Sequence, residues 1–163
     1  KTTISNRSTS VFTLSAVHQA TQALLDVKDD EKLTEQQEQI AFEYWNNLSK
    51  IIPEWREIIH GSMTASELRR NYIHAHTVSL LALGIAGNAL ITEFPEDWQE
   101  RLLKLASINW SRRNVSLWEG RAMVRGRMSK ARDSVTLTVN VIKRTLELPL
   151  NAKETELEQW IDG

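Results

Sequence analysis

Residues 78–91 read VSLLALGIAGNALI, the longest apolar run in the chain. A helix made from this run is apolar on nearly every face, which in a globular protein means burial on all sides. The run is too short to span a bilayer and is interrupted by Gly84, Gly87 and Asn88. Because each glycine weakens a helix by about 1 kcal/mol relative to alanine, we expect the two glycines to allow close approach of a neighbouring backbone. The run therefore predicts the second half of a long, buried central helix, at about residues 64–91.

Most of the remaining chain also has helical periodicity, which predicts an all-α fold with a single domain over residues 1–163. The expected helix starts are Ser10, a capping box from Thr34 to Gln37, Pro53, Thr64 or Ser66, and Pro95. Residues 133–148 fit both a strand and a helix, and we favour a helix because no partner strand is visible. At the C-terminus, Leu157, Trp160 and Ile161 are expected to dock one final turn.

Composition excludes several classes of site. The chain of 163 residues has no cysteine, which excludes disulfides, thiolate catalysis and zinc–thiolate sites and fits a reducing compartment. Residues 1–10 are polar, so no signal peptide is recognisable there, and we expect a cytoplasmic protein without membrane contact. Because the first residue is lysine, we expect a C-terminal piece excised from a longer protein.

Charge is concentrated between residues 110 and 145. The formal net charge of the whole chain is −1, whereas this stretch holds nine Lys or Arg against Glu119 and Asp133. Arginine presents a planar fork that suits phosphate oxygens, so the stretch predicts contact with a polyanion. The alternative is a solvated basic face. Acid-rich residues 26–57 and 147–163 flank the stretch, and they could either pack against it or confine DNA to one face.

Residues 120–127, GRAMVRGR, are the most specific local feature of the basic stretch. Their two glycines let a partner approach the backbone, and their three arginines supply donors. The alternative is a turn whose arginines pair with the acidic segments. The predicted phosphate contacts are Arg112, Arg113, Arg121, Arg125, Arg127, Lys130 and Arg132.

The sequence gives little support for a metal, a cofactor or catalysis. His74 and His76 are two residues apart, so on a helix they face opposite sides and do not share a metal ion easily. We expect one of them to be a hydrogen-bonded core residue and the other to face polar surface, and we expect Glu67 and Arg70 to be surface partners. Whether Glu67, His74 and His76 line a pocket is open. No nucleophile–base set or phosphate loop is recognisable, so we expect no enzyme, no metal and no cofactor.

A series of short motifs resembles, in the same order, the DGQHR-domain family that includes the DNA sulfur-modification regulator DndB. The resemblance covers most of residues 10–148. The motifs are Ser10–Ala16, Leu68–Arg69, His76, Leu80–Gly87, Trp110–Arg112, Trp118–Gly120, Arg125–Arg127, Leu137–Thr138, Asn140 and Ile142–Lys143. The Asp-Gly-Gln-His-Arg motif that names the family lies toward its N-terminus and is absent here.

The resemblance implies a bacterial, nucleoid-associated repressor that binds promoter DNA of a phosphorothioation cluster, in which sulfur replaces a non-bridging phosphate oxygen. It does not imply a sulfur-transfer enzyme. Two other functions stay open: a helical module for homo-oligomerisation or partner docking, with Trp110 and Trp118 as a candidate anchor surface, and an enzyme acting on nucleic acid. A preference for sulfur-modified DNA is also open.

Overall fold

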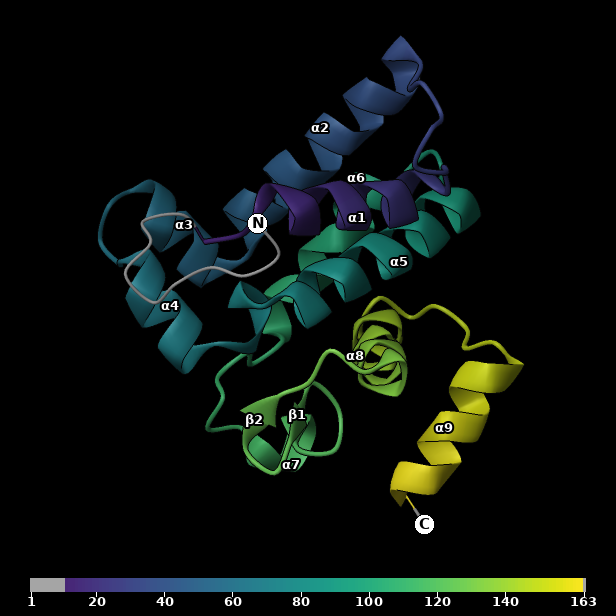
Figure 1. Cartoon of the computed structure of the whole chain (residues 1–163). Helices are drawn as coiled ribbons and strands as arrows, with labels where there is room; N and C mark the ends of the chain where they lie inside the picture. Colours follow the sequence, from purple (N-terminus) through teal and green to yellow (C-terminus); the bar gives the residue numbers. More distant parts are fainter. Residues whose placement is uncertain (1–10, 163) are drawn as a thin grey trace.

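The computed structural model describes residues 11–162, so the expected cap Ser10 lies outside the described residues. Within them the fold is all-α with one small hairpin, as predicted (Figure 1). The strands are β1 (Met123–Val124) and β2 (Arg127–Met128). The helices are α1 (Leu14–Leu25), α2 (Glu35–Ile51), α3 (Pro53–Ile59), α4 (Ala65–Asn71), α5 (Thr77–Glu93), α6 (Trp98–Leu102), α7 (Val115–Trp118), α8 (Arg132–Thr145) and α9 (Ala152–Asp162), with the 3-10 turns η1 (Ile73–Ala75) and η2 (Leu103–Ser107).

Helix α5 lies at the centre, between α1 and α8 (Figure 1). Both of its glycines are at close contacts, but only Gly84 meets a neighbouring backbone as predicted, whereas Gly87 accommodates a side chain. A Cβ on Gly84 would lie 2.3 Å from the backbone oxygen of Ala20 in α1, and a Cβ on Gly87 would lie 2.4 Å from the ring of Tyr44 in α2. The Tyr44 hydroxyl donates to the backbone oxygen of Leu83. The absence of side chains at both glycines therefore sets how closely α1 and α2 pack on α5.

The predicted helix over residues 64–91 is wrong in its bounds, because its first part is separated from α5. Thr64 caps α4 by accepting from the Glu67 amide, but the chain is extended at Tyr72 (φ −131°, ψ 141°). Tyr72 pairs with Ser111 in an antiparallel bridge, and the Ile73 amide donates to the backbone oxygen of Trp110. These long-range hydrogen bonds replace the helical ones, so the helix stops and restarts at Thr77.

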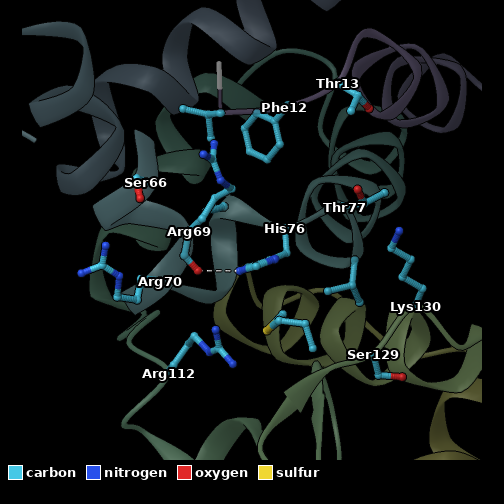
Figure 2. Close-up of a pocket in the computed structure, with 14 residues that line it drawn as sticks. Phe12, Thr13, Ser66, Arg69, Arg70, His76, Thr77, Arg112, Ser129 and Lys130 are labelled. Atoms are coloured by element: carbon cyan, nitrogen blue, oxygen red, sulfur yellow. Dashed lines mark hydrogen bonds between the residues drawn. The ribbon is translucent and has the colours of Figure 1, made fainter. Parts of the chain in front are cut away.

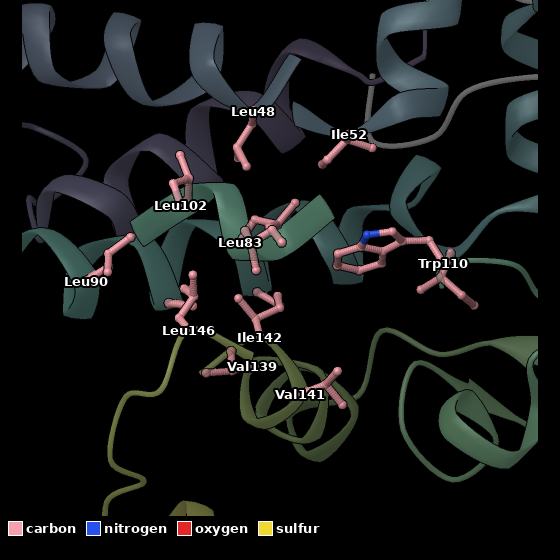
Figure 3. Close-up of a cluster of buried hydrophobic side chains, with 14 of the residues drawn as sticks. Leu48, Ile52, Leu83, Leu90, Leu102, Trp110, Val139, Val141, Ile142 and Leu146 are labelled. Atoms are coloured by element: carbon pink, nitrogen blue, oxygen red, sulfur yellow. The ribbon is translucent and has the colours of Figure 1, made fainter. Parts of the chain in front are cut away.

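The main core fills the space between α2, α5, η2 and α8 (Figure 3). Trp110 and Trp118 belong to it: they stack at 5.2 Å between ring centroids and are at most 2% exposed. The interpretation of these two tryptophans as an anchor surface is therefore wrong. Trp110 of the 109–114 link and Trp118 of α7 close this side of the core. The Trp118 indole donates to the backbone oxygen of Asn109.

The C-terminal half confirms one prediction and corrects two. Residues 132–145 form the helix α8, as favoured over a strand. The sequence predicts Pro95 in the first turn of a helix, but it lies in the turn of residues 95–97, and helix α6 begins after that turn at Trp98. The C-terminal segment does dock, but α9 turns Glu154 and Glu158 toward α8 and leaves Trp160 79% exposed. No helix within residues 11–162 is long and apolar enough to cross a membrane.

Gly84→Ala tests the close approach of α1 to α5. Alanine is the better helix former by about 1 kcal/mol, yet its methyl group would overlap a backbone oxygen that cannot rotate away. We expect the free energy of unfolding to fall by about 1–3 kcal/mol, as for other overpacked cores, measured by urea denaturation. Thr92→Ala, at an exposed position of the same helix, is the control and should change it by less than about 0.5 kcal/mol. A stabilised Gly84→Ala would contradict the contact.

Candidate nucleic-acid interface

The hairpin β1–β2 forms a hydrogen-bonded tip in the middle of the basic stretch. Its two turn residues, Arg125 (φ 54°) and Gly126 (φ 74°), are both left-handed, as a two-residue hairpin turn requires. The Glu119 carboxylate accepts hydrogen bonds from both of their amides. Arg112 donates from Nη2 to the backbone oxygen of Gly126 at 3.2 Å. The tip is thus held by Glu119 and Arg112, which precede the hairpin in the same chain. The side chains of Arg125 and Arg127 are left at the surface.

Six of the seven predicted phosphate contacts lie in or beside this hairpin. Five are exposed and Arg112 is half-buried. They come from the 109–114 link, from the hairpin and from the segment that leads into α8, which lie next to one another in Figure 1. Within residues 11–162 none of the six forms an ion pair with a carboxylate. We call them the exposed basic set: Arg112, Arg113, Arg125, Arg127, Lys130 and Arg132.

Arg121 does not belong to this set, and its prediction as a phosphate contact is wrong. Its side chain is buried, and both terminal nitrogens donate to the Glu158 carboxylate of α9. One of them also donates to the backbone oxygen of Leu137 at 3.0 Å. The alternative given by the sequence, an arginine paired with an acidic segment, is the arrangement found at this position.

The acidic C-terminal segment therefore packs against part of the basic stretch. Asn140 donates to Glu158 at 3.0 Å, Arg144 lies 3.1 Å from the same carboxylate, and Lys143 donates to Glu154 at 2.8 Å. Hydrogen bonding from Arg121 lowers the pKa of Glu158, an effect reinforced by Asn140 and opposed by burial. In this cluster Arg121 and two cations of α8 hold α9, whereas the exposed cations around the hairpin have no carboxylate partner within residues 11–162.

A hollow lies beside the hairpin, between η1, the start of α5 and residues 11–13 (Figure 2). Its volume is about 370 Å³, and a second hollow of about 420 Å³ adjoins it and shares Arg70 and Arg112 with it. No acidic residue is among the described residues that line either hollow. The cations that line them are Arg69, Arg70, Arg112, Arg113 and Lys130.

Sequence reasoning missed Arg69 and Arg70. The sequence predicts that Glu67 and Arg70, three residues apart on one helix, pair at the surface. The two form no ion pair among the described residues. Both arginines come near Arg112 because the helix breaks at Tyr72 and pairs there with Ser111. No local signal shows this break, and only the adjacent pair of arginines could have drawn attention to the site.

The two histidines have different environments, as predicted. His74 is fully buried, and its Nε2 lies 2.7 Å from the Glu54 carboxylate; burial lowers its pKa, and Glu54 partly offsets this. His76 lines the hollow, and its Nε2 donates to the backbone oxygen of Arg69 at 2.8 Å. Burial lowers the pKa of His76 too, with a further contribution from Arg112. The neutral His76 ring therefore keeps Nδ1 as an acceptor.

No group of three or more His, Asp or Glu within residues 11–162 is arranged to hold a metal ion. The chemistry of the face is instead that of anion binding. A profile of the DndB family, described as DNA-sulfur modification-associated, matches residues 1–149. The chain belongs to the DndB family. No curated protein and no solved structure is detectably similar to it. The match to DndB includes the exposed basic set and the hollow, and it ends before α9.

Glu158→Ala tests whether Arg121 is structural. The change leaves a buried guanidinium without its carboxylate, so we expect the free energy of unfolding to fall by about 3 kcal/mol or more, measured by urea denaturation. Glu156→Ala, an exposed acid on the same helix, should change it by less than about 0.5 kcal/mol. Replacing both partners, as Arg121→Met with Glu158→Leu, should recover most of the loss. Equal stability of Glu158→Ala and wild type would contradict the buried pair.

Proposed function

We propose that this chain is a DNA-binding regulator of a bacterial DNA sulfur-modification system, and that it contacts DNA through the exposed basic set. The observation that carries the proposal is that six cations lie in or beside one hairpin while no carboxylate among the described residues pairs with them. Membership of the DndB family supplies the biological setting. The proposed role is repression by occupancy of promoter DNA, with no catalytic step.

Phosphate binding is the chemistry that suits this face. Arg and Lys that neutralise DNA phosphates release condensed counterions, which gives affinity without reading the sequence. A hairpin tip held by Glu119 keeps Arg125 and Arg127 in place before DNA arrives. Less side-chain and backbone ordering is then needed on binding. Arg70 lies at the rim of the same face and is a further candidate contact.

The formal net charge of −1 does not oppose this proposal, because the charges are separated in space. Two acids of α9, Glu154 and Glu158, are buried against α8. Glu119, one of the two acids in the basic stretch, is bonded to the hairpin amides. Screening at physiological salt limits exposed charges to a range of about 8 Å. Acids elsewhere on the surface therefore weaken phosphate contacts at the hairpin only slightly.

The test is a double substitution at the hairpin, Arg125→Asn with Arg127→Gln. Asparagine tolerates the left-handed conformation of position 125, so the hairpin should persist. If both arginines contact phosphates, the slope of log K against log salt should become less steep by about 1.8, at about 0.9 for each lost contact. The measurement is fluorescence anisotropy with a duplex labelled at one end, over a salt series.

The matched control is Lys28→Gln with Lys32→Gln, which removes two exposed cations from the loop between α1 and α2. This pair should leave the salt slope unchanged. Equal slopes for the hairpin variant and the wild type would contradict the proposed contacts. Comparing promoter DNA with a scrambled duplex of equal length separates sequence preference from phosphate binding.

A second candidate function is a docking or oligomerisation module, with DNA contact made by another part of the protein. The observation that favours it is the exposed Trp160 of α9, beside Ile161, since tryptophan is enriched where proteins bind each other. Light scattering on the chain with and without DNA separates the two functions. An oligomer that Trp160→Ala converts to monomer, together with no DNA binding at low salt, would favour this candidate.

A further inference from the structure

The hollow beside the hairpin is larger than a phosphate contact needs. At about 370 Å³ it falls within the size range of small-ligand sites, about 300–1,000 Å³. It lies where α4 ends and α5 begins, and residues 11–13 close its far side. A DNA duplex offers its phosphates on a convex backbone and does not fill such a space. The shape of the hollow therefore suits a single small group.

Two kinds of side chain line the hollow. Figure 2 shows Arg112 and Lys130 at opposite ends of the hollow, with Lys130 beside Thr77, and the Phe12 ring across the hollow from Arg112 with Arg69 next to it. Val78 and Met128 add apolar surface. Among the described lining residues there is no carboxylate to oppose an anion. The lining thus offers positive charge on several sides together with one flat aromatic surface, the Phe12 ring.

Hydrogen-bonding groups also line the hollow. The neutral ring of His76 donates from Nε2 to the Arg69 backbone oxygen, which leaves Nδ1 as an acceptor. The hydroxyl of Thr77 lies at the first turn of α5, and both residues are drawn facing the hollow in Figure 2. Burial of His76 among arginines keeps it uncharged, so it can accept a donor from a ligand.

We propose that this hollow binds one nucleoside 5′-phosphate group. Its phosphate lies against Lys130 and Thr77 at the first turn of α5, and its base lies on Phe12. Arginine and lysine are the usual partners of phosphate, and aromatic rings stack on any base. This ligand is not the duplex of the proposed function. The duplex shares Arg112 and Lys130 with the hollow but also contacts Arg125 and Arg127, which do not line it. The group could come from a free nucleotide or from the end of a DNA strand.

Isothermal titration calorimetry of the whole chain at low salt tests the proposal. The probes are dAMP, inorganic phosphate, adenosine and a 5′-phosphorylated tetranucleotide. Tighter binding of dAMP or the tetranucleotide than of phosphate and of adenosine supports the proposal, and the stronger of the two identifies the source. Phosphate binding as tightly as dAMP would overturn it, because the base would then contribute nothing. The absence of binding by both nucleotide probes would also overturn it.

Two substitutions locate the binding. Thr77→Glu places a carboxylate in the hollow and should weaken nucleotide binding by about tenfold or more through like-charge repulsion. An acid at a helix N-terminus favours the helix, so this variant should fold. Lys130→Met removes an exposed cation and should weaken binding by about tenfold, the usual loss for a charged hydrogen bond. Unchanged affinity in both variants would overturn the assignment to this hollow.

The hairpin variant, Arg125→Asn with Arg127→Gln, separates this proposal from the proposed function. It should keep the nucleotide affinity of the wild type, because neither arginine lines the hollow. Loss of DNA binding in this variant with nucleotide binding intact supports two distinct sites. A parallel loss of both activities would overturn the separate nucleotide site. Nucleotide binding by a chain that never binds duplex DNA would contradict the proposed function alone.

Discussion

Burial of α5 on all sides is the constraint on which the rest of the structure depends. Because this helix has almost no polar face, α1, α2 and α8 must cover it, and Gly84 and Gly87 set how near two of them come. Its N-terminal end is the place where the helix meets a polar surface. The break between α4 and α5 places Arg70 and His76 there, next to Arg112. The hollow is thus a consequence of how the buried helix begins.

The basic stretch divides into cations that hold the fold together and cations left at the surface. Arg121, Lys143 and Arg144 pair with the acids of α9. Arg121 and Lys143 are buried, so loss of either carboxylate partner would leave a buried charge unpaired. Around the hairpin, the local acid Glu119 is bonded to backbone amides instead. Net charge alone does not distinguish these two groups. The position of α9 decides which cations are available to a polyanion.

Helical periodicity was enough to predict the all-α class, the buried run and the helical state of α8, and the Thr34–Gln37 motif predicted the capping box of α2. All of these features are determined by residues that are close in sequence. Contacts between distant residues decided the rest. The break at Tyr72 comes from pairing with Ser111, and burial of Arg121 comes from Glu158, 37 residues later. No local pattern encodes either contact. For the same reason the sequence predicted six surface arginines and lysines of the candidate site but neither Arg69, Arg70 nor the hollow.

The central claim is that the cations around the hairpin, and not those bound to α9, face DNA. Hydrogen–deuterium exchange of the chain with and without a short duplex at low salt tests it most directly. The account predicts slower exchange of backbone amides in residues 111–132 and around the α4–α5 junction, with α9 unchanged. Protection confined to α9 or to α2, with the hairpin exchanging as in the free chain, would contradict it.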